Sequence, residues 1–203
     1  MLEIIVARHG QSVADIENRH EGKADFPLTE LGIEQAEKLA CWLKYKYEID
    51  EIYSSPLKRA SKVAEIIGEK FEKEITFDER LKEMDNGVLA GLLREEATKL
   101  YPIPEGGRKY YQAIQDGESL IELRARAEHF FAELIHSRDF EKENKRILIV
   151  SHGGLINMLY RTFLNLPMDT GVCLNTGDTG VHVWRVSGKT RVVAASNMQY
   201  HLK

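Results

Sequence analysis

The stretch ILIVSHGG, residues 147–154, joins four apolar residues to a serine, a histidine and two glycines. An apolar run of this length predicts a short strand that is covered on both faces, as in a parallel sheet. The glycines open the next predicted helix, over residues 154–164. The stretch IIVARHG, residues 4–10, repeats the pattern of an apolar strand followed by a His-Gly pair. Two such strands predict two histidines at the same edge of a sheet.

Strand-like and helix-like segments alternate along the rest of the chain. Further strands are predicted at residues 51–54, 75–77, 181–186 and 191–195. Helices are predicted from the Thr29 cap onward, from Ser55-Pro56 onward, and over residues 93–100 and 118–138. This alternation predicts an α/β protein, a three-layer α/β/α sandwich with a mostly parallel central sheet. The last two strands have no helix between them, so we expect them to pair antiparallel at an edge.

The length of 203 residues fits a single domain, residues 1–203. One segment, residues 86–117, is rich in Gly, Pro and charge. Long irregular segments in compact domains often carry binding roles. We therefore expect residues 86–117 to form an insertion that acts as a lid and sets specificity.

The bulk composition limits the partners of the protein. A net charge of −4 does not suggest a nucleic-acid partner. Cys41 and Cys173 make no disulfide framework and fit a reducing compartment. No targeting segment is recognisable, and no apolar run approaches the roughly 20 residues of a membrane helix. We expect a cytoplasmic protein without membrane contact; a homodimer is compatible with these features.

Charged side chains follow the predicted strands where a ligand would bind. Arg8 and His9 end one strand, His152 follows another, and Arg59 lies on the first turn of the helix after a third. Because the carboxyl ends of parallel strands share one edge, we expect these side chains to meet. Two guanidinium groups and a helix N-terminus suit a phosphate dianion. An oriented histidine is also an accepted covalent nucleophile.

Other interpretations of these histidines are weaker. A lone histidine after a strand is usually structural, but three strand ends with matching chemistry are hard to explain separately. Zinc needs a third ligand at close spacing, which the sequence does not offer. No Walker loop and no carboxylate cluster suited to magnesium is present, so we expect phosphoryl-transfer chemistry without a metal or cofactor. Ordinary surface or packing roles are expected for His20, His129, His136, His182 and His201.

Several motifs, in order along the chain, resemble those of the histidine phosphatase superfamily, the phosphoglycerate-mutase-like proteins. They are RHGQS at residues 8–12, FPLTELG at 26–32, YSSPLKRA at 53–60, LKEMD at 81–85, GES at 117–119 and VSHGG at 150–154. The resemblance covers nearly the whole chain and points to the phosphatase branch. It implies a phosphoglycerate-mutase-like fold and a phosphohistidine intermediate.

The resemblance also implies roles for individual residues. His9 would be the nucleophile, and Glu83 would protonate the leaving oxygen and then activate water. Phosphate contacts are implied for Arg8, Arg59 and His152, with Ser119 and the N–H of Gly153 as further candidates.

The chain departs from the family pattern on the substrate side. Asp15 stands where many members have an Asn that donates to the phosphate, and Glu21 stands near a position that is often Gln. Residues 86–91 (NGVLAG) replace a Phe-Gly-x-Trp-x-Gly pattern found in many phosphatases. An ionised Asp15 would repel phosphate, so it points elsewhere, is protonated, or meets a cationic part of the substrate. We hypothesise that Asp15 and Glu21 disfavour phosphorylated carboxylic acids.

Three functions follow from these observations. The first is a metal-independent phosphomonoester hydrolase for a small phosphorylated metabolite. The second is a cofactor-dependent phosphoglycerate mutase; mutases of this type are usually longer, so the length favours hydrolysis. The third is a non-catalytic phospho-ligand binding module, which would not need a nucleophile such as His9 or an acid such as Glu83.

Overall fold

The computed structural model describes residues 1–136 and 144–203. Within these ranges six strands form one sheet, in the order β3-β2-β4-β1-β5-β6. The strands are β1 (Leu2–Arg8), β2 (Glu51–Ser54), β3 (Ile75–Phe77), β4 (Lys145–Ser151), β5 (Val181–Ser187) and β6 (Thr190–Met198). β3, β2, β4 and β1 run parallel, whereas β5 is antiparallel to both β1 and β6. The mostly parallel sheet and the antiparallel last pair are therefore confirmed.

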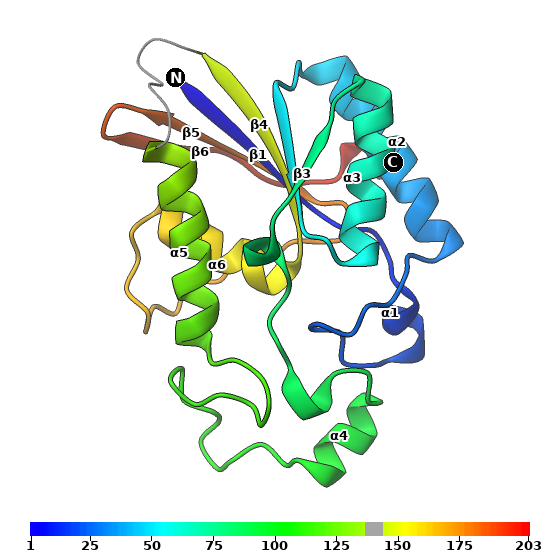
Figure 1. The fold of residues 1–203 in the computed structure, drawn as a ribbon, viewed down its shortest axis with the longest axis vertical. Helices are drawn as coiled ribbons and strands as arrows, with labels where there is room; N and C mark the ends of the chain where they lie inside the picture. The colour runs from blue at the N-terminus through cyan, green and yellow to red at the C-terminus, as the bar shows by residue number, and fades with distance from the viewer. Residues whose placement is uncertain (137–143) are drawn as a thin grey trace.

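Helices cover both faces of this sheet (Figure 1). Ile5 belongs to the core shared with α2 and α3, whereas its neighbour Ile4 belongs to the core shared with α5 and α6. Successive residues of a strand point to opposite faces, so one apolar run can fill both cores. The predicted three-layer sandwich is confirmed. The α-helices are α1 (Val13–Glu17), α2 (Glu30–Lys46), α3 (Lys58–Phe71), α4 (Arg94–Leu100), α5 (Leu120–His136) and α6 (Gly153–Phe163), and the 3₁₀ turns are η1 (Glu79–Leu81), η2 (Gly87–Leu89) and η3 (Tyr200–Leu202).

Two helices next to the histidines, α3 and α1, differ from the prediction. α3 begins at Lys58 and not at Pro56. Its N-cap residue Leu57 provides no side-chain cap, and Lys58 N donates to Asp25 Oδ1 at 2.6 Å. The hydroxyl of Ser55 instead lies 2.8 Å from His152 Nε2, which makes Ser55 part of the histidine cluster. The short helix α1 was not predicted, because its capping residue Ser12 lies in a motif that suggested only a loop. The predicted end of α5 near Arg138 lies outside the described residues.

Residues 86–117 contain η2 and α4, and α4 confirms the helix predicted at residues 93–100. This segment has a small core of its own, formed by Leu89, Ala97 and Ile114. Its backbone is bonded to the loop after α1, since His20 N donates to Leu92 O at 2.9 Å. α4 therefore lies beside α1, beyond the end of the sheet (Figure 1). Closure of this segment over a ligand stays a prediction.

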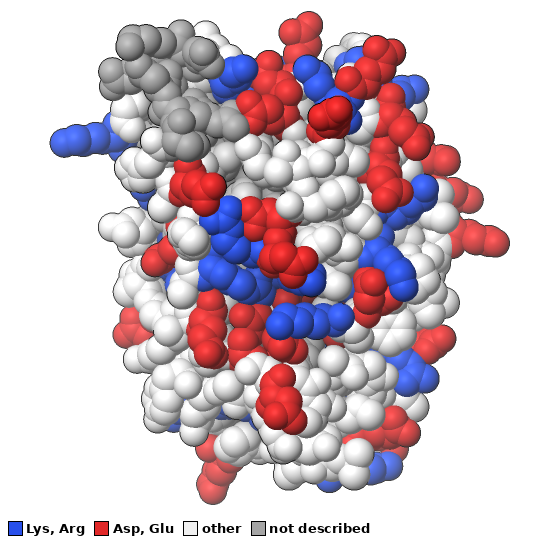
Figure 2. Space-filling view, in the orientation of Figure 1, with Lys and Arg blue, Asp and Glu red and all other residues white. Residues whose placement is uncertain are grey.

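The described residues contain no helix with both the length and the apolar character of a membrane span. Acidic and basic side chains are mixed over the face shown in Figure 2. A site for a strong anion on this face must therefore rest on local placement of cationic groups.

Candidate active site

Strand register brings the two predicted histidines together. Arg8 is the partner of Ser151 in the β1–β4 pairing, so the residues that follow, His9 and His152, leave the sheet side by side. Their ring centroids are 5.1 Å apart. His9 N donates to Ser151 O at 3.1 Å, which ties the end of β1 to the end of β4. Both side chains are buried.

A hydrogen bond to the backbone fixes the ring of His9. Its Nδ1 lies 2.7 Å from Gly10 O. A carbonyl can only accept, so we assign the proton to Nδ1 and a lone pair to Nε2. Burial lowers the pKa of His9 well below 6.5, with further lowering by the charges of Arg59 and Arg8. The ring is therefore neutral at physiological pH, as a nucleophile requires.

Arg59 points its guanidinium at that nitrogen. Its Nε lies 3.3 Å from His9 Nε2, and its side chain is fully buried. Nη1 donates to Ala24 O at 3.0 Å and Nη2 to Gly22 O at 2.9 Å. Two backbone carbonyls thus fix the orientation of this charge next to His9 Nε2.

Arg8 approaches the same place from β1. Its Nη1 donates to Thr176 O at 2.9 Å and lies 3.6 Å from Asp178 Oδ1. Its Nε is buried and has no hydrogen-bond partner among the described residues. A Cβ added at Gly153 would lie 3.9 Å from this Nε, so Arg8 faces the start of α6. An unpaired buried donor beside a helix N-terminus suits an anion.

His152 is the N-cap residue of α6. Its Nε2 bonds to Ser55 Oγ, while its Nδ1 is buried without a partner among the described residues. Burial lowers its pKa well below 6.5, and the charge of Arg59 lowers it further. One ring nitrogen is therefore oriented by Ser55, and the other remains available to a ligand.

Glu83 comes from the segment after η1 and reaches the first turn of α6. Its Oε2 accepts from Gly154 N at 2.9 Å, and its Oε1 accepts from Leu155 N at 3.1 Å and Met84 N at 2.8 Å. A side chain at position 154 would collide with it, because an added Cβ would lie 2.5 Å from Glu83 Oε1. Gly154 thus lets a carboxylate lie against the first turn of the helix that His152 caps.

Comparisons with known proteins identify the family of this chain. The sequence model of the histidine phosphatase superfamily (branch 1) matches residues 4–199. The chain belongs to this superfamily. It is 34% identical to the phosphoglycerate mutase-like protein 4 of Arabidopsis thaliana, over 91% of this chain and 79% of that protein. It is 30% identical to the phosphoserine phosphatase 1 of Hydrogenobacter thermophilus, over 100% of this chain and 95% of that protein.

Solved structures lead to the same family. The structure of a mycobacterial glucosyl-3-phosphoglycerate phosphatase in complex with VO3 superposes with a TM-score of 0.85 and 28% identity. The match covers 96% of this chain and 98% of that one. The fold and the phosphatase relatives together identify this histidine phosphatase as an enzyme.

Sequence reasoning missed Arg126, which holds the segment that carries Glu83. Its guanidinium donates to Arg80 O at 2.7 Å and to Glu83 O at 2.9 Å, and it also bonds to Lys82 O. It pairs with Glu118 at 2.7 Å. Glu118 in turn accepts a hydrogen bond of 2.7 Å from Asp85 N. Glu118 lies in the GES motif, but nothing in the sequence connected Arg126 with it.

The two acidic departures from the family pattern occupy different places. Asp15 Oδ2 accepts from Ser12 N at 2.8 Å and completes the capping box of α1. Of the three possibilities for Asp15, the structure shows the one in which its carboxylate points to a helix start. Glu21 instead faces the histidines, with Oε2 at 3.9 Å from His9 Nε2.

Ser119, a further candidate for phosphate contact, lies at the start of α5. Its hydroxyl bonds to Glu122 Oε2 at 2.8 Å, and its backbone N–H donates to the same oxygen. In this arrangement Ser119 caps a helix, and its contact with phosphate stays a prediction.

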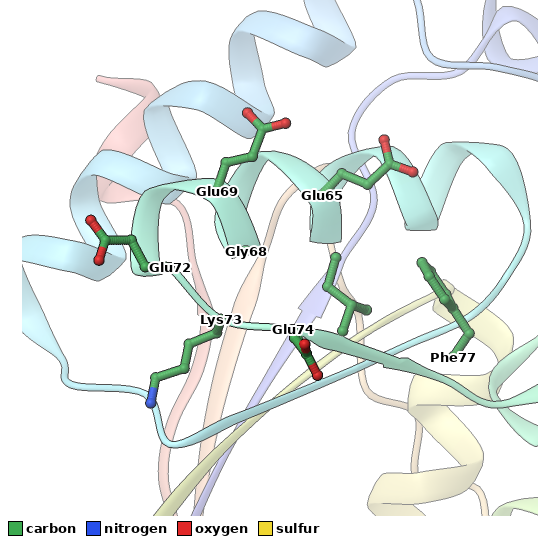
Figure 3. A pocket seen from close by; sticks show the side chains of 8 residues that line it. Glu65, Gly68, Glu69, Glu72, Lys73, Glu74 and Phe77 are labelled. Atoms are coloured by element: carbon green, nitrogen blue, oxygen red, sulfur yellow. The ribbon is translucent and has the colours of Figure 1, made fainter.

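A hollow elsewhere on the molecule has the wrong charge for a phosphate ester. It lies between the C-terminal end of α3 and β3, and Figure 3 shows glutamates around it with a single lysine. Glu65, Glu69, Glu72 and Glu74 line it together with Lys73. An anion would be repelled there, so the edge of the sheet beside His9 is the better candidate.

Proposed function

We propose that this histidine phosphatase hydrolyses phosphate monoesters of a small metabolite through a phosphohistidine formed on His9. One observation carries the proposal: His9 Nε2, to which we assign a lone pair, lies 3.3 Å from Nε of the buried Arg59 side chain. A neutral nucleophile next to a fixed positive charge suits attack on an anionic phosphoryl group. The phosphatase relatives support the same activity.

The proposed reaction has two displacement steps. In the first, His9 Nε2 attacks phosphorus while the bond from phosphorus to the ester oxygen breaks, and Glu83 protonates the departing oxygen. In the second, Glu83 takes a proton from water, the water oxygen attacks phosphorus, and the bond to Nε2 breaks. Inorganic phosphate and an alcohol are the products.

Charge neutralisation is assigned to the protein itself. Arg8 Nε, Arg59 Nε and the start of α6 supply positive charge, and His152 Nδ1 and the N–H of Gly153 are proposed as further contacts to the phosphoryl oxygens. Phosphoryl transfer depends mainly on positioning and on such neutralisation. The proposal therefore includes no metal and no cofactor.

The experiment uses a generic aryl phosphate and a panel of phosphorylated metabolites, with His9→Ala as the blank. We expect turnover that is unaffected by a chelator, and radiolabel from the substrate that is bound to the protein in an acid-labile form. Both should disappear in His9→Ala. Full activity in His9→Ala would contradict the proposal.

Phosphoglycerate mutase activity is the second candidate. It is favoured by the name of the Arabidopsis relative, a phosphoglycerate mutase-like protein. Isomerisation of phosphoglycerate in the presence of a bisphosphate primer, followed by phosphorus NMR, separates the two activities. Isomerisation faster than phosphate release would favour the mutase. The third hypothesis, a non-catalytic module, is not retained, because the relatives of this chain are enzymes.

A further inference from the structure

Glu21 contacts both groups that the proposed function places on the phosphoryl group. Its Oε1 lies 3.3 Å from Arg59 Nε, and its Oε2 lies 3.9 Å from His9 Nε2. Ser12 Oγ donates to Oε1 at 2.6 Å and holds the carboxylate in this place. Glu21 therefore has the contacts that an anionic oxygen of a bound ligand would make.

A phosphoryl group cannot share this place with Glu21. His9 is 1% exposed and Arg59 is 0% exposed, so a ligand reaches them only after a neighbouring group gives way. An ionised carboxylate would also repel a dianion bound to the same guanidinium. Asp15, the other extra carboxylate, is engaged in the capping box of α1. Glu21 is therefore the carboxylate that competes with a bound phosphoryl group for His9 and Arg59.

We propose that Glu21 takes the place of a phosphoryl oxygen in the free enzyme, and that a dianion binds only after Glu21 takes up a proton or leaves Arg59. The proposal rests on the proposed function, which assigns the phosphoryl group to His9 and Arg59. It makes Glu21 a specificity-determining residue, because the site prefers phosphoryl groups of lower negative charge while Glu21 is ionised.

The surroundings of Glu21 allow its protonation to be followed. Burial raises the pKa of Glu21, and Asp15 adds to the rise, while Arg59 and Arg8 oppose it. Burial lowers the pKa of His9 and of His152 well below 6.5, in the direction opposite to the rise at Glu21. Burial also raises the pKa of Asp178, which lies beside Arg8. The charged groups that face Glu21 are thus Arg59, Arg8 and Asp15, with Glu83, Asp25 and Asp178 next to those arginines.

The test measures binding of inorganic sulfate by calorimetry between about pH 5 and about pH 8, where sulfate keeps both charges. For the wild-type enzyme we expect affinity to fall at least about tenfold as pH rises, since Glu21 becomes ionised. In Glu21→Gln the affinity should be nearly constant across this range and higher than wild type at the upper end. Glu34→Gln, which removes the same charge from the exposed face of α2, should behave as wild type.

Three results would overturn the proposal. The first is a flat wild-type profile, which needs no variant and is informative even where Glu21→Gln folds poorly. The second is weaker sulfate binding in Glu21→Gln at the upper end of the range. The third is a sulfate affinity that no longer depends on pH in Asp178→Asn but still depends on pH in Glu21→Gln. Sulfate binding does not require turnover. If sulfate binding shows the expected pH profile but the enzyme has no phosphatase activity, the proposed function is rejected and the proposal for Glu21 is not.

Discussion

The carboxylate of Glu83 lies on the first turn of α6, where Oε2 accepts a hydrogen bond of 2.9 Å from the N–H of Gly154. The proposed proton donor is thereby fixed to the same helix that His152 caps. Acid, second histidine and helix N-terminus form one unit, although Glu83 and Gly154 are 71 residues apart.

This contact predicts that Gly154→Ala lowers activity without lowering stability. The added Cβ would lie 2.5 Å from Glu83 Oε1, and the flexible glutamate is the group that moves. We expect turnover of an alkyl phosphate to fall about tenfold or more. The melting temperature should be nearly unchanged, since the higher helix propensity of alanine offsets the hydrogen bonds that are lost when Glu83 moves. Gly171→Ala is the matched control, because nothing lies within 4 Å of a Cβ at that position. Wild-type turnover in Gly154→Ala would contradict the assigned position of Glu83.

Ser55→Ala tests whether the orientation of His152 matters. The variant leaves His152 Nε2 without the hydroxyl at 2.8 Å. One lost hydrogen bond corresponds to about 1.4 kcal/mol, or roughly a tenfold lower kcat/KM. Ser61→Ala on α3 is the control, since its hydroxyl donates to Lys58 O of its own helix. Equal kinetics for Ser55→Ala and wild type would show that His152 needs no partner on Nε2.

Arg126→Lys tests the support of the Glu83 segment. A lysine cannot reproduce the fork of bonds to three backbone carbonyls and Glu118. Because Glu83 is proposed to protonate the leaving oxygen, turnover of alkyl phosphates should fall more than turnover of an aryl phosphate with a good leaving group. Arg124→Lys on the same helix should lower both rates equally or not at all. A uniform loss in Arg126→Lys would indicate a purely structural role.

Stability should fall in mild acid because of His182. This buried side chain bonds to Thr176 Oγ1 at 2.9 Å, and burial lowers its pKa to about 4. Below its unfolded value of 6.5, the unfolded chain binds a proton that the folded protein does not. The free energy of unfolding therefore decreases as pH falls from about 6.5 to about 4, by up to about 3 kcal/mol.

Urea unfolding at several pH values measures this effect. His182→Gln should flatten the profile relative to wild type, and His136→Gln, at the exposed end of α5, should leave it unchanged. An unchanged slope in His182→Gln would assign the acid sensitivity to other groups.

Much of the fold could be predicted from the sequence, because its signals are local. The apolar runs at residues 4–7 and 147–150 identify strands covered on both faces, and the His-Gly pairs after them fall at one edge by the geometry of parallel strands. Thr29 likewise predicts the start of α2, because threonine is a common N-cap residue. In the structure its side chain accepts from Gly32 N at 3.0 Å.

Only the tertiary structure decided which side chains complete the site. Ser55 suggested a helix cap in the sequence, yet strand pairing places its hydroxyl against His152. Asp15 and Glu21 were equivalent acidic departures, but one caps α1 and the other faces His9 and Arg59. Such contacts join segments far apart in the chain and depend on the direction of each side chain. Periodicity along the sequence carries no information about either. The meeting of Arg59 and His152 with His9 could therefore be predicted from the sequence, whereas the contacts of Ser55 and Glu21 could not.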